Sequence, residues 1–262
     1  MFYHNINPVL LEIGYFQIRY YGLFYALGFV IAYFLIIYFA KIKGLSITKD
    51  DAGDLLFYAL IGDVVGARAA YVLFYNPVFY FKNPFEAIAI WHGGLSFHGG
   101  LIGIIAATWL FCKKKKIEFY DLADIIVIPA ALALALGRIG NFMNGELYGR
   151  ITSVSWCVDY SRNQFISSLP DGCRHPSQIY ESIKNIAIFC FLFSIKNKKY
   201  PKGFMFWCFI ASYGMLRTLV EFFRQPDEQV GFIFNYITMG QLLSFPLFLI
   251  GMYMIFRLDW KK

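Results

Sequence analysis

The chain has 262 residues, of which 58% are hydrophobic and 20% aromatic, and only 16% are charged. Soluble domains carry roughly 25% charged residues, so this composition excludes an ordinary soluble protein and is typical of a polytopic membrane protein. The net charge of +7 does not indicate nucleic-acid binding, because most of it comes from lysines in short loops between apolar segments.

Seven apolar segments are long enough to cross about 30 Å of hydrocarbon as helices. In chain order they span residues 20–40, 54–75, 94–112, 121–138, 177–195, 203–223 and 236–256. The amino-terminal sequence MFYHNINPV has no basic region and no cleavage site, so we expect the first segment to serve as the insertion signal. The sequence predicts an all-α membrane protein, with residues 1–262 forming a single polytopic domain that is a seven-span helical bundle.

The lysines predict the orientation of this bundle. Thirteen of the fifteen lysines lie in four clusters, which follow the first, third, fifth and seventh segments. The clusters are Lys41, Lys43 and Lys49; Lys113–Lys116; Lys196, Lys198, Lys199 and Lys202; and Lys261 and Lys262 together with Arg257. Short loops rich in lysine stay in the cytoplasm, so the amino terminus is predicted outside and the carboxyl terminus inside. Eight of the nine arginines then lie near the outer leaflet, which indicates a need for guanidinium groups there.

The glycine pairs in WHGGLSFHGG, residues 91–100, predict a broken or re-entrant element before the third span. Irregular backbone at membrane depth must be covered by protein or must line a wet cavity. His98 lies in the predicted outer half, where a neutral imidazole could accept a proton from a thiol or hydroxyl group. A histidine that only hydrogen-bonds two helices together explains the residue equally well. Arg68 in the second segment is a further outer charge that could contact phosphate or Asp63.

The longest polar segment, residues 141–176, is predicted to form a small external head. It contains Cys157 and Cys173, which could form a disulfide in an oxidising compartment. Sequence separation does not give the distance between their Cα atoms, so this pairing is left open.

The segment GRIGNFMNGELYGR, residues 137–150, combines two arginines with four glycines at the outer end of a predicted span. Arginine forks suit phosphate oxygens, and glycines let the backbone approach a ligand. Arg138 and Asn141 are spaced i, i+3 and therefore share a helix face. A polar loop whose glycines only turn the chain is the alternative interpretation.

A second polar group lies on the sixth segment, where Tyr213, Arg217, Glu221 and Arg224 are spaced as one helical stripe. A charged pair at membrane depth indicates a functional site by default, because it is costly unless it faces the bundle interior. A structural salt bridge is the alternative. The chain has no pair of Cys or His residues at metal-ligand spacing, so no metal site is predicted, and the arginines favour an anionic headgroup.

These segments together resemble the bacterial prolipoprotein diacylglyceryl transferases. The resemblance is carried, in order along nearly the whole chain, by YYGLFYALGF, GGLSFHGGLIG, GRIGNFMNGELYGR, HPSQIYES, YGMLRTLVEFFRQPD and YITMGQLLS. It implies a seven-span enzyme of the bacterial cytoplasmic (inner) membrane that performs the first step of lipoprotein maturation. Such an enzyme transfers the diacylglyceryl group of phosphatidylglycerol to the lipobox cysteine of a prolipoprotein and releases glycerol 1-phosphate. The resemblance implies no metal and no organic cofactor.

The functional positions that the resemblance implies are Tyr21, His98, Arg138, Asn141, Glu146, Gly149, Tyr213, Arg217 and Glu221. We predict that Arg138 and Arg217 bind the phosphate, because negative charge develops on the leaving group. Arg68 and Arg224 are further candidates for substrate binding.

The remaining roles follow from the chemistry of the nucleophile. A thiol with a pKa of about 8.5 needs a base near neutral pH, and His98 is the predicted base. Tyr21 and Asn141 are predicted to orient the headgroup or the nucleophile, and Glu221 to hold Arg217. The predicted partners are phosphatidylglycerol, the prolipoprotein signal peptide and membrane lipids, and no nucleic acid.

A secondary transporter of an organic anion is the alternative from another class, since it would also need buried arginine and glutamate. Transporters usually contain paired halves around a midplane site, whereas this sequence shows no repeat and gathers its polar residues toward one leaflet. A helix-packing scaffold would explain the small-xxx-small pairs Gly62/Gly66 and Gly99/Gly103, but not the arginines. The sequence leaves open the oligomeric state, the lateral gate for lipid and the acyl-chain preference.

Overall fold

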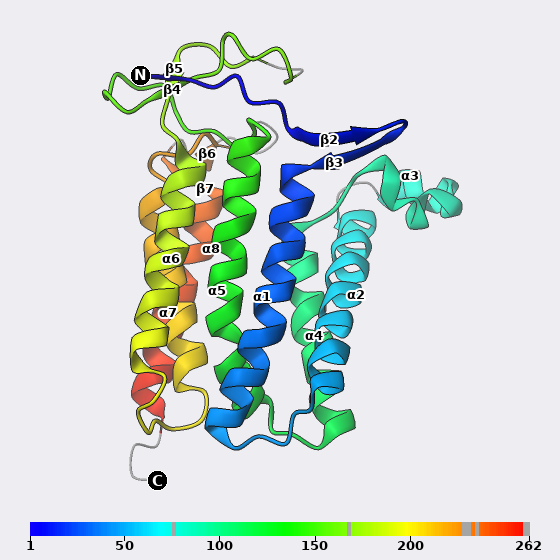
Figure 1. The fold of residues 1–262 in the computed structure, drawn as a ribbon, viewed down its shortest axis with the longest axis vertical. Coiled ribbons are helices and arrows are strands. Elements are labelled where there is room, and N and C mark those ends of the chain that lie inside the picture. The colour runs from blue at the N-terminus through cyan, green and yellow to red at the C-terminus, as the bar shows by residue number, and fades with distance from the viewer. Residues whose placement is uncertain (75–76, 167–168, 227–231, 234–235, 259–262) are drawn as a thin grey trace. The chain divides into compact units, whose positions relative to one another are not determined.

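The computed structural model describes residues 1–74, 77–166, 169–226, 232–233 and 236–258 (Figure 1). The side chains of residues 97, 98, 232 and 233 are also outside the described part. The long helices are α1 (Tyr20–Lys43), α2 (Lys49–Phe74), α4 (Phe97–Lys115), α5 (Phe119–Met143), α6 (Ser177–Ile195), α7 (Phe204–Val220) and α8 (Met239–Arg257). This mainly helical architecture confirms the predicted all-α membrane fold.

Each of the seven predicted apolar segments corresponds to one of these helices. Five of them, α1, α2, α5, α6 and α8, are long and apolar enough to cross a membrane. Helix α7 is apolar but shorter, with 17 residues, and α4 ends in three lysines. Seven crossings therefore stay a prediction. The lysines at 261 and 262, which form the last predicted cytoplasmic cluster, lie outside the described residues.

The chain divides into two compact units, one of residues 1–35 with 123–262 and one of residues 36–122. In the second unit, α2 packs closely on α4 through glycines. A Cβ atom on Gly62 would lie 2.5 Å from the Gly103 carbonyl oxygen and 2.7 Å from the Ala107 Cβ. Gly66 faces Gly99 in the same way. The predicted use of these glycines in helix packing is confirmed, while the single-domain organisation stays a prediction.

This packing makes the substitution Gly62→Ala informative. The added methyl group would push α2 away from α4, and we expect overpacking to cost about 1–3 kcal/mol of stability. Gly53→Ala in the same helix is the matched control, because a Cβ atom there meets nothing within 4 Å. Thermal unfolding in detergent should give a lower midpoint for Gly62→Ala only; equal midpoints for the two variants would contradict the close contact.

The chain between α2 and α4 contains short helical turns. They are α3 (Pro77–Lys82), η1 (Pro84–Ile88) and η2 (Ile90–His92). Gly93 and Gly94 follow with φ angles of 80° and 77°, which suit glycine. Ser96 then caps α4, since its side chain accepts a hydrogen bond from the Gly99 N–H. The backbone is irregular at the first glycine pair, Gly93 and Gly94, whereas the second pair, Gly99 and Gly100, lies within α4. Re-entry of this segment into the membrane stays a prediction.

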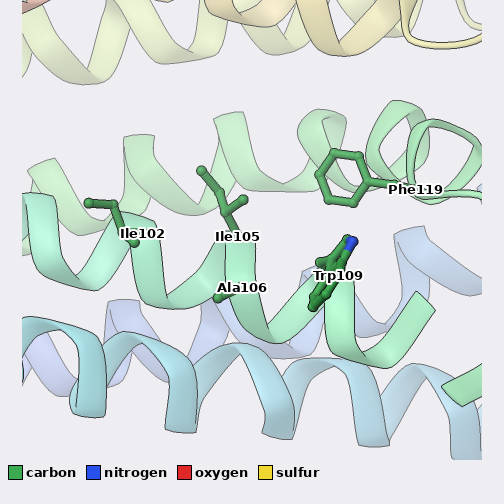
Figure 2. A pocket seen from close by; sticks show the side chains of 5 residues that line it. All are labelled: Ile102, Ile105, Ala106, Trp109 and Phe119. Atoms are coloured by element: carbon green, nitrogen blue, oxygen red, sulfur yellow. The ribbon is translucent and has the colours of Figure 1, made fainter. Parts of the chain in front are cut away.

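A pocket in the same unit is lined by Ile102, Ile105, Ala106 and Trp109 of α4 and by Phe119 at the start of α5 (Figure 2). The Lys113 ammonium group lies 3.7 Å from the centre of the Trp109 ring. The five lining side chains offer no acid, base or nucleophile, so this pocket is not a candidate for the chemistry of the site.

In the first unit, α5, α6, α7 and α8 run alongside one another, and β4 (Val158–Asp159) and β5 (Cys173–Arg174) lie beyond one end of them (Figure 1). Helices α7 and α8 approach closely at Gly214, where a Cβ atom would meet the Ser244 carbonyl oxygen. The buried Asp124 of α5 accepts hydrogen bonds from the backbone N–H groups of Gly203 and Phe206, and so caps α7.

The predicted head contains a three-stranded sheet in the order β1 (Phe2–Tyr3), β4, β5. Cys157 and Cys173 form a disulfide with a Cα–Cα distance of 5.6 Å, which settles the pairing that the sequence left open. The fully buried His4 lies 2.7 Å from the Phe142 carbonyl oxygen and 2.6 Å from the Asn163 amide nitrogen. Burial lowers the pKa of His4, so a neutral ring ties the amino terminus to the end of α5.

The remaining strands form two short hairpins. Strand β2 (Val9–Ile13) pairs antiparallel with β3 (Phe16–Arg19), directly before α1. Strand β6 (Phe232–Ile233) pairs antiparallel with β7 (Ile237–Thr238). Thr238 then caps α8 through a capping box with Gln241.

Candidate active site

Two buried carboxylates lie at the ends of α6 and α7 that the lysine clusters predict to face outward. Glu181 of α6 and Glu221, which directly follows α7, are 2% and 1% exposed. Arg217 of α7 joins them, because its Nη1 forms an ion pair with Glu181 and its Nη2 lies 2.8 Å from the Glu221 carboxylate. Buried charges are tolerated when they are paired in this way. Arg217 is thus fixed between two carboxylates.

Arg138 of α5 approaches the same carboxylate from another helix. Its Nε lies 3.9 Å from a Glu181 oxygen, and its Nη1 donates to the Asn141 side-chain oxygen at 3.4 Å. Charge-assisted hydrogen bonds are typically about 2.7–2.9 Å long, so both contacts are loose. The structure therefore brings Arg138 and Arg217 together at Glu181, with Arg138 the more weakly held and the more available to a ligand.

The segment that follows α5 is held by its own polar side chains. The Asn141 amide donates to the Glu146 carboxylate at 2.8 Å, and the Asn144 amide donates to the same oxygen at 3.1 Å. Tyr21 of α1 packs against Gly140, where a Cβ atom would lie 3.0 Å from the tyrosine ring. Tyr21 therefore lies next to the helix turn that carries Asn141. The orienting roles of both residues stay predictions.

Gly149 is a point of close backbone approach. Its N–H donates to the His175 carbonyl oxygen at 2.9 Å, and a Cβ atom would lie 2.5 Å from the Phe223 carbonyl oxygen. Next to it, Arg150 Nε donates to the Arg224 carbonyl oxygen at 2.9 Å. These contacts join the end of the segment 137–150 to the chain after α7. They account for the glycine structurally, and its substrate contact stays a prediction.

The predicted stripe of the sixth segment is largely present. Helix α7 ends at Val220, before the predicted boundary, yet Arg224 Nη1 still lies 3.5 Å from the Glu221 carboxylate. The Thr238 hydroxyl donates to Glu221 at 3.1 Å from the start of α8. Glu221 thus holds Arg217 as predicted, and it also links the ends of α7 and α8.

Two charged residues in the cluster were not predicted from the sequence. Glu181 accepts from Lys184 Nζ at 2.7 Å, and the Lys184 ammonium group lies 4.0 Å from the centre of the Tyr213 ring. The feature that points to these residues is a polar face on α6, which is buried in the structure. It is formed at helical spacing by Gln178, Glu181, Ser182 and Asn185. Charges inside an apolar segment could have identified both residues.

Arg68 and His98 belong to the unit of residues 36–122. The buried Arg68 guanidinium donates to the carbonyl oxygens of Glu86, Ala87, Gly93 and Gly94. These hydrogen bonds fasten the irregular segment before α4, and phosphate binding by Arg68 stays a prediction. The His98 side chain lies outside the described part, so its role as a base also stays a prediction.

The protein is helical and polytopic, and its arginines converge on buried carboxylates. This arrangement is typical of an intramembrane site for an anionic ligand. A family model described as prolipoprotein diacylglyceryl transferase matches residues 8–257. The chain belongs to the prolipoprotein diacylglyceryl transferase family.

Similar proteins over the full length carry the name phosphatidylglycerol–prolipoprotein diacylglyceryl transferase. One from Geobacter sulfurreducens is 44% identical, covering 100% of this chain and 99% of the relative. One from Legionella pneumophila strain Lens is 41% identical, covering 99% and 98%. One from Rickettsia bellii strain OSU 85-389 is 40% identical, covering 100% and 99%. The transporter alternative gains no support from these relatives.

Proposed function

We propose that the chain transfers the diacylglyceryl group of phosphatidylglycerol to the lipobox cysteine thiol of prolipoproteins, in the cytoplasmic membrane of a bacterium. The amino terminus faces outward and the carboxyl terminus the cytoplasm, in line with the lysine clusters. The observation that carries the proposal is the convergence of Arg138 and Arg217 on Glu181, within a chain that resembles named transferases over its whole length.

The reaction is a displacement at the glyceryl carbon that carries the phosphate. The cysteine sulfur forms a carbon–sulfur bond while the carbon–oxygen bond to phosphate breaks, and glycerol 1-phosphate leaves with the bonding electron pair. The thiol proton goes to a base. Two guanidinium groups directed at the phosphate stabilise the charge that develops on the leaving oxygen, and in a site shielded from water this effect is strong.

Arg138 and Arg217 divide this task. Arg217 is fixed by Glu181 and Glu221, so its position is set before lipid arrives. Among the described residues, the polar contacts of Arg138 with Glu181 and Asn141 are long, so its guanidinium group is available to form paired hydrogen bonds with the phosphate. Tyr21 and Asn141 orient the headgroup or the nucleophile beside them, with Glu146, Gly149, Tyr213 and Arg224 as further substrate contacts.

His98 is the base in this proposal. His98→Gln should lower the transfer rate by about 10²–10⁴-fold at pH 7, because general base catalysis typically contributes that much. The loss should shrink as pH rises toward the pKa of the thiol, where thiolate forms without help. Steady-state rates from pH 6 to 9 measure this. Wild-type rates for His98→Gln across the range would remove His98 as the base.

The function itself is tested with purified protein in vesicles that contain phosphatidylglycerol and a lipobox peptide. Mass spectrometry should find the peptide heavier by one diacylglyceryl group, together with released glycerol 1-phosphate. A peptide with serine in place of cysteine is the control and should stay unmodified. Uptake of a labelled organic anion into the vesicles without peptide modification would instead favour a transporter.

A further inference from the structure

Lys184 is a buried cation to which no role in the reaction has been given. It lies on α6 and is 4% exposed, with its ammonium group 2.7 Å from Glu181 and 4.0 Å from the Tyr213 ring centre. A lysine is rarely buried in an apolar helix without a functional reason, since the charge is costly there. Because Lys184 is buried and its ammonium group contacts Glu181, we expect it to act on a ligand through that carboxylate.

The pairing around Glu181 is unequal. Arg138, Lys184 and Arg217 all direct charge at this one carboxylate. Arg217 has a second carboxylate, Glu221, at 2.8 Å. Besides Arg217, the close partner of Glu181 is Lys184, whose ammonium nitrogen lies 2.7 Å from the carboxylate. The Arg138 Nε lies farther away, at 3.9 Å. If Lys184 were neutral, Glu181 would keep only Arg217 as a close cationic partner. The carboxylate would then attract Arg138 more strongly and compete with phosphate for its guanidinium group.

The charge on the phosphate changes during the reaction. A phosphodiester carries one negative charge, whereas a phosphate monoester carries up to two above its second pKa of about 6. A fixed positive charge therefore attracts the monoester about twice as strongly as the diester. Interactions accelerate the reaction when they are stronger in the transition state, where this charge develops on the leaving oxygen, than with the bound substrate.

We propose that Lys184 is a positioning residue that neutralises Glu181, so that the Arg138 guanidinium stays available and the site prefers the dianionic leaving group over the monoanionic lipid headgroup. This inference rests on the proposed function, which supplies the two anions. The test does not depend on that function, because the preference between the two anions can be measured by binding alone.

The experiment compares Lys184→Met with wild type at about pH 7, where a phosphate monoester is already mostly dianionic, using two soluble probes in calorimetry. Glycerol 1-phosphate is the dianion, and glycerophosphoglycerol is the monoanion with the same connectivity as the lipid headgroup. Loss of one nearby positive charge should weaken binding of the dianion by about tenfold and of the monoanion by about threefold. Lys198→Met, in an exposed loop, is the matched control and should change neither affinity.

Two further variants separate charge from packing. Lys184→Arg keeps the charge and should retain the preference for the dianion. Glu181→Gln combined with Lys184→Met leaves the net charge of the site unchanged, so the affinity for each anion, and with them the preference, should return close to the wild-type values. In the transfer assay, that double variant should stay slow, because the arginines have lost their shared carboxylate.

Equal weakening of both anions by Lys184→Met, or no weakening of either, would overturn the inference. Failure of Lys184→Arg to retain the preference would do the same. If Lys184→Met does not yield folded protein, the Lys184→Arg variant and the double variant decide the question. A wild-type protein that binds both probes as expected but modifies no lipobox peptide would count against the proposed transferase function and leave the preference for the dianion standing.

Discussion

Replacing Arg138 by lysine should reduce diacylglyceryl transfer by at least about 100-fold while leaving membrane insertion unchanged. Lysine keeps the charge but cannot present two parallel N–H groups to a phosphate. Loss of one preorganised donor to a developing oxyanion typically costs about 10²–10³-fold in rate. The ion pair that Arg138 makes with Glu181 is long, at 3.9 Å, so the substitution should cost little stability. Steady-state transfer in phosphatidylglycerol vesicles measures the effect.

Arg162→Lys provides the matched control. Its guanidinium lies 4.5 Å from the centre of the Tyr3 ring in the head and takes no part in the Glu181 cluster. That variant should transfer at close to the wild-type rate. Near-normal turnover of Arg138→Lys would refute the phosphate role of Arg138, whatever the control shows.

Replacing Glu221 by alanine should have the largest effect on stability. The carboxylate is 1% exposed and contacts Arg217, Arg224 and the Thr238 hydroxyl. Removing one member of a buried ion pair typically costs about 3–5 kcal/mol, because the partner charge is left uncompensated. Thermal unfolding in detergent should show a clearly lower midpoint, and transfer should fall because Arg217 is no longer fixed.

Glu12→Ala removes an exposed carboxylate from β2 and is the control for that comparison. Its hydrogen bond from Gln17, at 3.1 Å, lies on the surface and should contribute well under about 1 kcal/mol. Should Glu221→Ala unfold at the same midpoint as Glu12→Ala, the carboxylate would not be the link between α7 and α8 that the structure indicates.

The helices were predictable because hydrocarbon thickness and lysine-rich loops leave a strong signal in sequence. The residues at which the helices begin and end were harder to predict. Helix α2 begins at Lys49, five residues before the predicted segment, since acidic residues such as Asp50 and Asp51 stabilise a helix start without raising its hydropathy. Helix α7 ends at Val220 because the following residues turn to meet Arg150.

The site was predictable in part. The i, i+3 pair Arg138 and Asn141 and the i, i+4 pair Arg217 and Glu221 follow from helical geometry within one segment. The carboxylate that receives both arginines, Glu181, lies on a third helix, and pairing between helices depends on how they pack. The disulfide between Cys157 and Cys173 was undecided for the same reason, since only tertiary structure sets the distance between their Cα atoms.

A double-mutant cycle on Arg138→Lys and Arg217→Lys tests the central claim most directly. If both guanidinium groups bind one phosphate, their effects on kcat/KM in the vesicle assay should be coupled, and the double variant should be at least about tenfold faster than the product of the single losses predicts. Multiplicative losses would mean that the two arginines act independently and would contradict a shared phosphate site.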